Sequence, residues 1–259
     1  MPIRFYWEIY KVALKARTEY RIEFAVGIVT SVLTQLSALA FYWVVFSRLP
    51  SLGGWPPSGV LFLFAMTAMV LGLSELALNG IWWLPWYVVG GELDRLLLCP
   101  MPTLHFVLMA RPEVHAFGNL GLGVVLLALS YSHLSLGFGG LLLIPIWVIS
   151  GVLIYTAGLV VMGCLCFSAV GPWAQQFSLV NQLLQVARYP LRIYPPWLQT
   201  LLLTAFPIGV STYVPGQWLF EHSPLWIAAL APPFAAALAV AFVHWLWERS
   251  LRRYESTGS

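Results

Sequence analysis

A short charged segment stands out in the middle of an otherwise apolar chain. It reads Gly91-Glu92-Leu93-Asp94-Arg95, and Pro100 follows it closely. The glycine breaks the preceding helix, and the two carboxylates suit the first turn of the next one, where the helix dipole is positive. We therefore predict a short amphipathic helix over about residues 91–99 that presents Glu92, Asp94 and Arg95 to a soluble partner. The alternative is a helix that only spaces its two neighbours.

A polar stripe lies further along the chain. Its four residues recur at steps of three, four and three, so they share one face of a helix. They are Gln175, Ser178, Gln182 and Gln185. Lipid would penalise such a face, which should therefore line a protein interface or a substrate path. The alternative is a helix that lies flat on the cytoplasmic surface of the membrane.

Glu75, beside Ser74, lies well inside an apolar stretch. Desolvating a carboxylate there is costly, which makes Glu75 a candidate for lining a transport pathway. It could equally be protonated or pair with a residue of a partner protein.

Motifs for catalysis or nucleotide binding are missing from the sequence. It has no G-x-x-x-x-G-K-[ST] loop for phosphates, no H-E-x-x-H and no G-x-S-x-G. The five histidines lack the spacing of metal ligands, and the three cysteines give no disulfide framework. We therefore expect a chain that is not an enzyme, binds no cofactor or metal of its own and has no nucleic-acid partner.

The composition shows which elements must position these residues. Hydrophobic residues make up 60% of the 259 residues and charged residues only 9%, against roughly 25% in soluble domains. A soluble fold of this size could not bury so much apolar surface. Five stretches are close to the roughly 20 apolar residues that a membrane crossing needs. They are residues 22–46, 60–81, 114–132, 141–167 and 225–246.

One more crossing is needed between residues 171 and 224 if both ends of the chain lie on one side. Hydropathy favours residues 197–214, whereas the shorter stretch 173–189 carries the polar stripe. Prolines interrupt the region and suggest a broken, re-entrant hairpin over about residues 190–216. These prolines are Pro190, Pro195, Pro207 and Pro215. Either placement gives an all-α integral membrane protein with six crossings.

Basic residues predict the orientation, because cytoplasmic loops are rich in Lys and Arg. With the N-terminus inside, ten of the 13 Lys and Arg residues are cytoplasmic. Residues 1–21 place charges on one helical face and aromatic residues on the other, so we expect an interfacial helix that serves as an anchor or also contacts a cytoplasmic partner. Residues 22–247 would then form the transmembrane domain, and residues 248–259 a cytoplasmic tail.

Three stretches resemble the permease subunits of type-2 ABC exporters, in a branch of uncharacterised bacterial permeases. The first is the segment Gly91–Arg95 with Pro100. The second runs from Tyr189-Pro190-Leu191 through Tyr194-Pro195 and Pro207 to Tyr213-Val214-Pro215, and the third covers residues 247–259. The resemblance also includes the six-span layout and the N-terminal helix, so it covers nearly the whole chain.

The resemblance implies a permease of the bacterial inner membrane that pairs with a second permease and two ATPase subunits, which would bind ATP and Mg²⁺. It implies that residues 92–98 form the coupling helix that docks into the ATPase. It also implies that the hairpin lies on the outer side and that residues 173–189 are the fifth crossing. Such a complex exports its substrate by alternating access. A heterodimer of permeases is favoured over a homodimer, and the substrate is left open.

A secondary transporter or channel that works without an ATPase is the main alternative. It predicts inverted repeats and several charges inside the membrane, whereas Glu75 is nearly alone and no convincing repeat occurs. A membrane scaffold or a membrane-embedded enzyme is a further alternative, and it would need converging polar groups that the sequence does not show.

Overall fold

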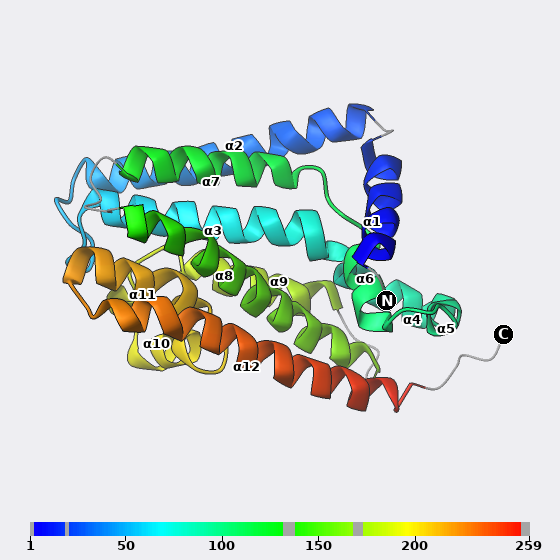
Figure 1. Cartoon of the computed structure of the whole chain (residues 1–259). Coiled ribbons are helices and arrows are strands. Elements are labelled where there is room, and N and C mark those ends of the chain that lie inside the picture. Colours follow the sequence, from blue (N-terminus) through cyan, green and yellow to red (C-terminus); the bar gives the residue numbers. More distant parts are fainter. Residues whose placement is uncertain (1–2, 19–20, 132–137, 168–172, 255–259) are drawn as a thin grey trace.

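The computed structural model describes residues 3–18, 21–131, 138–167 and 173–254, which are almost entirely helical (Figure 1). Short 3₁₀ helices, labelled η, join or extend several of the α-helices. In chain order the elements are α1 (Ile3–Thr18), α2 (Arg21–Phe46), α3 (Pro57–Leu78), η1 (Asn79–Trp83), α4 (Leu84–Val89), α5 (Glu92–Leu97), α6 (Thr103–Met109), α7 (Ala116–Tyr131), α8 (Phe138–Cys164), η2 (Leu165–Phe167), α9 (Trp173–Val186), η3 (Leu191–Ile193), α10 (Pro196–Leu203), α11 (Ile208–Glu221) and α12 (Leu225–Leu251).

Four helical stretches among the described residues are long and apolar enough to cross a membrane. They are Ala25–Phe46, Pro57–Val89, Gly140–Phe167 and Leu225–Leu251. They correspond to the first, second, fourth and last crossings predicted from the sequence. The third and fifth predicted crossings correspond to α7 and α9, which are shorter, with 16 and 14 residues. The multi-span helical architecture is thus confirmed, whereas the total of six crossings stays a prediction.

The proline-rich region folds into two helices that meet at a sharp angle. α10 and α11 together have the apolar length of a span, but they are bent by 101° at the break between them. Thr204 leaves helical geometry at the end of α10, and Pro207 precedes α11. A bend of this size is that of a broken span or a re-entrant hairpin. It excludes one straight helix over residues 197–214, the placement that hydropathy favoured.

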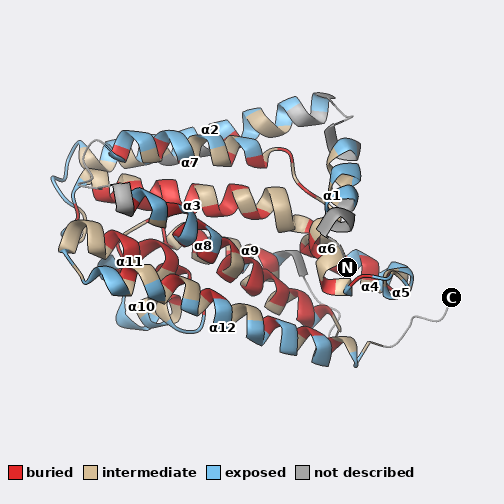
Figure 2. Cartoon of the chain, viewed as in Figure 1, coloured by how far each residue is buried: buried red, intermediate tan, exposed pale blue. Residues whose placement is uncertain are grey.

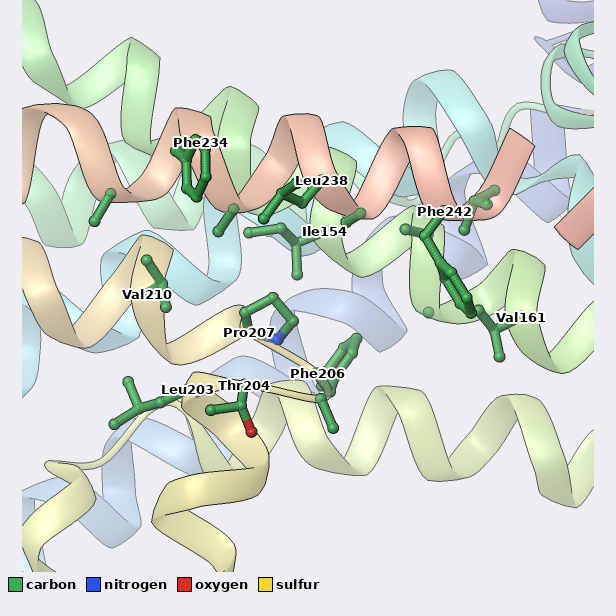
Figure 3. A pocket seen from close by; sticks show the side chains of 17 residues that line it. Ile154, Val161, Leu203, Thr204, Phe206, Pro207, Val210, Phe234, Leu238 and Phe242 are labelled. Carbon is green, nitrogen blue, oxygen red and sulfur yellow. The ribbon is translucent and has the colours of Figure 1, made fainter. Parts of the chain in front are cut away.

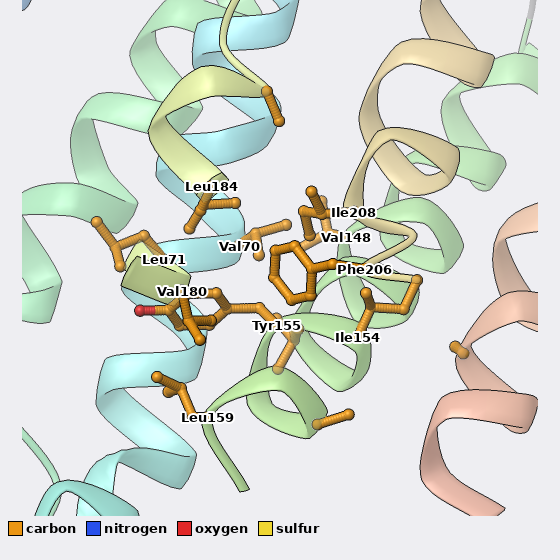
Figure 4. Close-up of a cluster of buried hydrophobic side chains, with 14 of the residues drawn as sticks. Val70, Leu71, Val148, Ile154, Tyr155, Leu159, Val180, Leu184, Phe206 and Ile208 are labelled. Atoms are coloured by element: carbon orange, nitrogen blue, oxygen red, sulfur yellow. The ribbon is translucent and has the colours of Figure 1, made fainter. Parts of the chain in front are cut away.

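The core is built around α3 and α8. α3 packs against α7 on one side and α8 on another, while α8 also contacts α9, α11 and α12. Buried residues therefore concentrate on α3, α8 and α11, and exposed ones on the outer faces of α2 and α12 (Figure 2). Val180 and Leu184 of α9 enter a buried cluster with Val70 of α3 and Tyr155 of α8 (Figure 4). This packing fixes the rotation of α9 and hence the direction of its polar residues.

Glycines allow α3 and α7 to approach closely. A Cβ atom on Gly72 would lie 2.6 Å from the backbone nitrogen of Leu120, and one on Gly123 would lie 2.9 Å from that of Met69. Membrane helices commonly pack through small residues in this way. The close contact brings the start of α7 against Glu75 on α3.

α1 lies across one end of the bundle, at a steep angle to the long helices (Figure 1). Tyr10 Oη donates to the carbonyl oxygen of Leu76 at 3.0 Å, which attaches α1 to the end of α3. Lys11 pairs with Glu8 at 2.7 Å on an exposed face, as the amphipathic pattern predicts. The place of α1 in the headgroup plane stays a prediction, and residues 255–259 of the predicted tail lie outside the described residues.

Candidate functional site

Two adjoining polar cavities lie within the helical bundle, and Glu75, His115 and Asn181 line both. The first has a volume of about 370 Å³ and lies between α2, α3, α7 and α9, with Arg188 also in its wall. The second has a volume of about 420 Å³ and is bordered by aromatic residues. These are Trp82, Trp83, Trp86 and Tyr155.

Glu75 is the polar centre of the two cavities. Its side chain is only 16% exposed. Asn119 Nδ2 donates to Glu75 Oε2 at 2.7 Å, and His115 Nε2 lies 3.6 Å from Oε1. The Glu113 amide also donates to the backbone carbonyl of Glu75 at 3.0 Å. The partly buried Glu75 is therefore held by polar groups of α7 and of the segment just before it. These groups belong to the same chain and not to a partner protein.

The predicted polar stripe on α9 divides between two environments. Gln185 lines the first cavity. Gln175 and Gln182 are exposed, and Gln182 Nε2 donates to Ser178 Oγ at 3.3 Å. Gln185 thus borders the first cavity, whereas Gln175 and Gln182 face outward from the bundle and Ser178 is half-exposed.

Among the residues of the first cavity that the sequence did not predict as site residues, four carry an imidazole, an amide or a guanidinium group. They are His115, Asn119, Asn181 and Arg188. Asn181, Gln185 and Arg188 follow one another at steps of four and three, which is the same helical signal as that of the stripe. His115 and Asn119 are likewise four residues apart. The signal was present, but it becomes specific only once α7 and α9 are placed against α3.

α5 forms the predicted short helix between the second and third crossings. Gly91 begins it with a φ of 69°, a left-handed conformation that glycine adopts without steric cost. Leu93 is fully buried and fixes the helix to the bundle. Glu92 and Arg95 are exposed, and Leu98, directly after the helix, is 86% exposed. The free surface therefore combines both signs of charge with an apolar side chain.

Asp94 is less exposed than Glu92 and Arg95, and its expected role in coupling stays a prediction. It lies beside Tyr254 at the end of the chain, and burial together with the nearby carboxylate raises the pKa of Tyr254. The Tyr254 ring packs edge-on against Phe167, with 6.0 Å between ring centroids, and Phe167 packs against Trp247 of α12. Asp94 thus faces the last helix of the bundle as well as solvent.

Three of the four predicted hairpin prolines precede helices. Pro190 precedes η3, Pro195 precedes α10 and Pro207 stands at the break before α11. Pro215 instead lies inside α11 and does not interrupt it, which corrects its expected role as a breaker. Beside the break, an apolar cavity of about 520 Å³ lies between α8, α11 and α12 (Figure 3).

In the part of the chain that the structure describes, no group of three or more His, Cys, Asp or Glu residues is placed to hold a metal ion. The polar cavities instead offer amides, hydroxyls, a carboxylate, an imidazole and a guanidinium. Such a set can hold a polar ligand inside a membrane.

The match with a protein family covers most of the chain. Residues 32–258 match the model described as "ABC-2 family transporter protein", and this range includes α5, most residues of both polar cavities and the α10–α11 bend. No curated protein matches the chain. The helical, multi-span structure agrees with the family match, and the resemblance noted in the sequence is confirmed. The chain therefore belongs to the ABC-2 family of transporter proteins, whose members are multi-pass permeases of membrane transport systems.

Proposed function

We propose that the chain is the permease of an ABC exporter in the bacterial inner membrane and is coupled to ATPase subunits that are separate chains. α5 carries this proposal. Its exposed Glu92 and Arg95, with Leu98 behind them, stand at the end of the bundle where α1 and the last turn of α12 lie (Figure 1). Charges around an exposed leucine suit a groove on a soluble protein. Both termini would then lie on the cytoplasmic side.

The packing of α5 supports a role in transmitting force. α5 contacts α4, and α4 continues the helical stretch Pro57–Val89 that contains α3. On another side, Asp94 faces Tyr254, which follows α12. A displacement of α5 by an ATPase that binds ATP and Mg²⁺ would therefore act on two long helices. This route supports alternating access, in which the cavity opens first inward and then outward.

The pathway would run beside the polar cavities at an interface with a second permease. In the apolar stretch of α2 only 6% of residues are buried, and the first cavity lies between α2 and α9. Gln175 and Gln182 on the exposed side of α9 favour a protein neighbour there, because lipid would penalise them. We favour a complex of two different permeases and two ATPase subunits, as the resemblance implies.

Co-purification tests this proposal. The chain is expressed together with the genes that neighbour its own, and recovery of an ATPase subunit and ATP hydrolysis are measured. The double variant Arg95→Glu with Leu98→Asp should lose most of the ATPase, because it reverses a charge and removes an apolar contact without touching the buried Leu93. The matched control is Arg48→Glu with Leu49→Asp, two exposed residues at the opposite end of the bundle; it should keep the ATPase. Equal ATPase recovery by both double variants would refute docking at α5, and substrate movement by the purified chain alone along an ion gradient would favour a secondary transporter.

A further inference from the structure

Arg188 is a buried cation without an acidic partner among the described residues. It lies two residues after the end of α9 and is only 8% exposed, and its Nε has no hydrogen-bond partner in the described part of the chain. Its guanidinium lies 5.6 Å from the centre of the Phe64 ring, and it borders the first polar cavity. A guanidinium in such a place is costly unless an anion or several acceptors compensate it.

Two other arginines of the chain have polar partners. Arg192, four residues further on, pairs with Glu221 at 2.8 Å. Arg111 donates to Tyr87 Oη at 3.1 Å and stacks over Trp83 at 4.0 Å. The fold therefore provides partners for arginines in neighbouring places, and the position of Arg188 on a cavity needs another explanation.

The wall around Arg188 is built for a polar ligand. Gln185 and Asn181 lie on the preceding turns of α9 and add two amides to the same cavity. The Oδ1 atom of Asn181 is buried and has no hydrogen-bond partner among the described residues. Glu75 lines the cavity too, but Asn119 and His115 engage its carboxylate. It makes no ion pair with Arg188.

We propose that this cavity binds the phosphate monoester headgroup of an amphiphile, with Arg188 as its anchor. A guanidinium offers a planar fork of donors that matches phosphate oxygens. A phosphate monoester also carries a hydroxyl during part of its titration near neutral pH, which can donate to Asn181 Oδ1, whereas an ionised carboxylate only accepts. α2 lines the cavity with Thr30 and Thr34, and the residues that precede these two, Val29 and Leu33, are exposed and apolar. These residues can contact an acyl chain, which favours a lipid-like molecule over a soluble anion.

The role of this molecule as exported substrate rests on the proposed function, but its binding does not. Binding is measured on the purified full chain in neutral detergent by calorimetric titration with dihexanoyl phosphatidic acid. Dihexanoylglycerol, which lacks the phosphate, is the control ligand. We expect the phosphate-bearing lipid to bind and the control lipid to bind at least tenfold more weakly.

Two pairs of variants assign the binding to Arg188. Arg188→Gln should weaken binding of the phosphatidic acid at least tenfold, and Arg188→Lys, which keeps the charge but loses the fork, should weaken it less. Arg192→Gln and Arg192→Lys should bind like the wild type. Without ligand, Arg188→Gln should melt at the same temperature as the wild type or higher, because it removes an uncompensated charge. Equal affinity of Arg188→Gln and wild type, or equal binding of both lipids, would overturn the proposal.

A final experiment distinguishes an exported substrate from a lipid that stays bound to the permease. The complete complex is placed in vesicles that contain a fluorescent phosphatidic acid, and the movement of this lipid between leaflets is measured with and without ATP. ATP-dependent movement that Arg188→Gln abolishes identifies a substrate. Binding without movement identifies a resident lipid and leaves the anion site in place. Failure of ATPase coupling with intact, Arg188-dependent binding would count against the proposed function and not against this site.

Discussion

The hydrogen bond between Asn119 and Glu75 offers a quantitative test of the cavity. The two side chains meet at 2.7 Å, and that of Glu75 is 16% exposed, so solvent screening is limited. Neutral hydrogen bonds between membrane helices contribute about 0.6 kcal/mol in double-mutant cycles. Bonds to a charged group are roughly twice as strong and reach about 1.5–3 kcal/mol in soluble proteins. With Glu75 as a carboxylate, we therefore expect a coupling of about 1–3 kcal/mol.

The assay is reversible unfolding in mixed micelles of the wild type, Glu75→Ala, Asn119→Ala and the double variant. The cycle cancels whatever else each side chain contacts. Ser74 and Thr156 provide a matched neutral pair, because their hydroxyls lie 3.1 Å apart in the buried contact between α3 and α8. That pair should couple by about 0.6 kcal/mol. A Glu75–Asn119 coupling no larger than that of Ser74–Thr156 would refute the account of a carboxylate held by α7.

Two further predictions concern the packing that positions the site. Gly72→Ala should cost about 1–3 kcal/mol in thermal melting, because its Cβ would lie 2.6 Å from a backbone nitrogen of α7. Gly121→Ala, which meets nothing within 4 Å, should stabilise by about 0.8–1 kcal/mol; a similar loss at both positions would contradict the close approach of α3 and α7. Asp94→Asn should lower the pKa of Tyr254 toward its ordinary value, because the variant removes the carboxylate that disfavours the tyrosinate. Since the pKa of Tyr254 is raised in the folded chain, its contact with Asp94 stabilises the fold fully below the ordinary tyrosine pKa of about 10. This stabilisation is lost as the pH rises through the raised pKa. Difference spectra of tyrosine ionisation should show this shift but none for the exposed control Glu92→Gln, and unchanged spectra for Asp94→Asn would exclude the contact.

Hydropathy predicted the long helices well because the bilayer demands long apolar stretches. It was less informative where helices leave the apolar layer. α12 continues to Leu251, beyond the predicted end at residue 246, because a helix needs no apolar side chains outside lipid. The stretch that begins with α3 likewise continues through η1 and α4 to Val89, whereas the predicted crossing ended at residue 81. The α10–α11 bend needed its prolines rather than its hydropathy.

Two residues of the first cavity were predictable from the sequence, namely Gln185 from the polar stripe and Glu75 by itself. Glu75 stood out because a carboxylate in an apolar stretch is unusual. Arg188 and Asn181 did not, because their importance depends on α2 and α7, which are far away in sequence and lie across the same cavity. The contact of Asp94 with Tyr254 joins the middle of the chain to its end, and no local pattern predicts such a pair.

Site-specific photo-cross-linking at Leu98 tests the central claim most directly. A benzophenone side chain replaces Leu98, which is 86% exposed after α5, or Leu49, which is 47% exposed at the opposite end of the bundle. After irradiation of cells, the adducts are identified by mass spectrometry. The account predicts an adduct at position 98, and none at position 49, with a protein that carries a phosphate-binding loop and hydrolyses ATP. An ATPase adduct at position 49, or its absence at position 98 while the ATPase still co-purifies, would contradict the proposal that α5 receives the force of ATP hydrolysis.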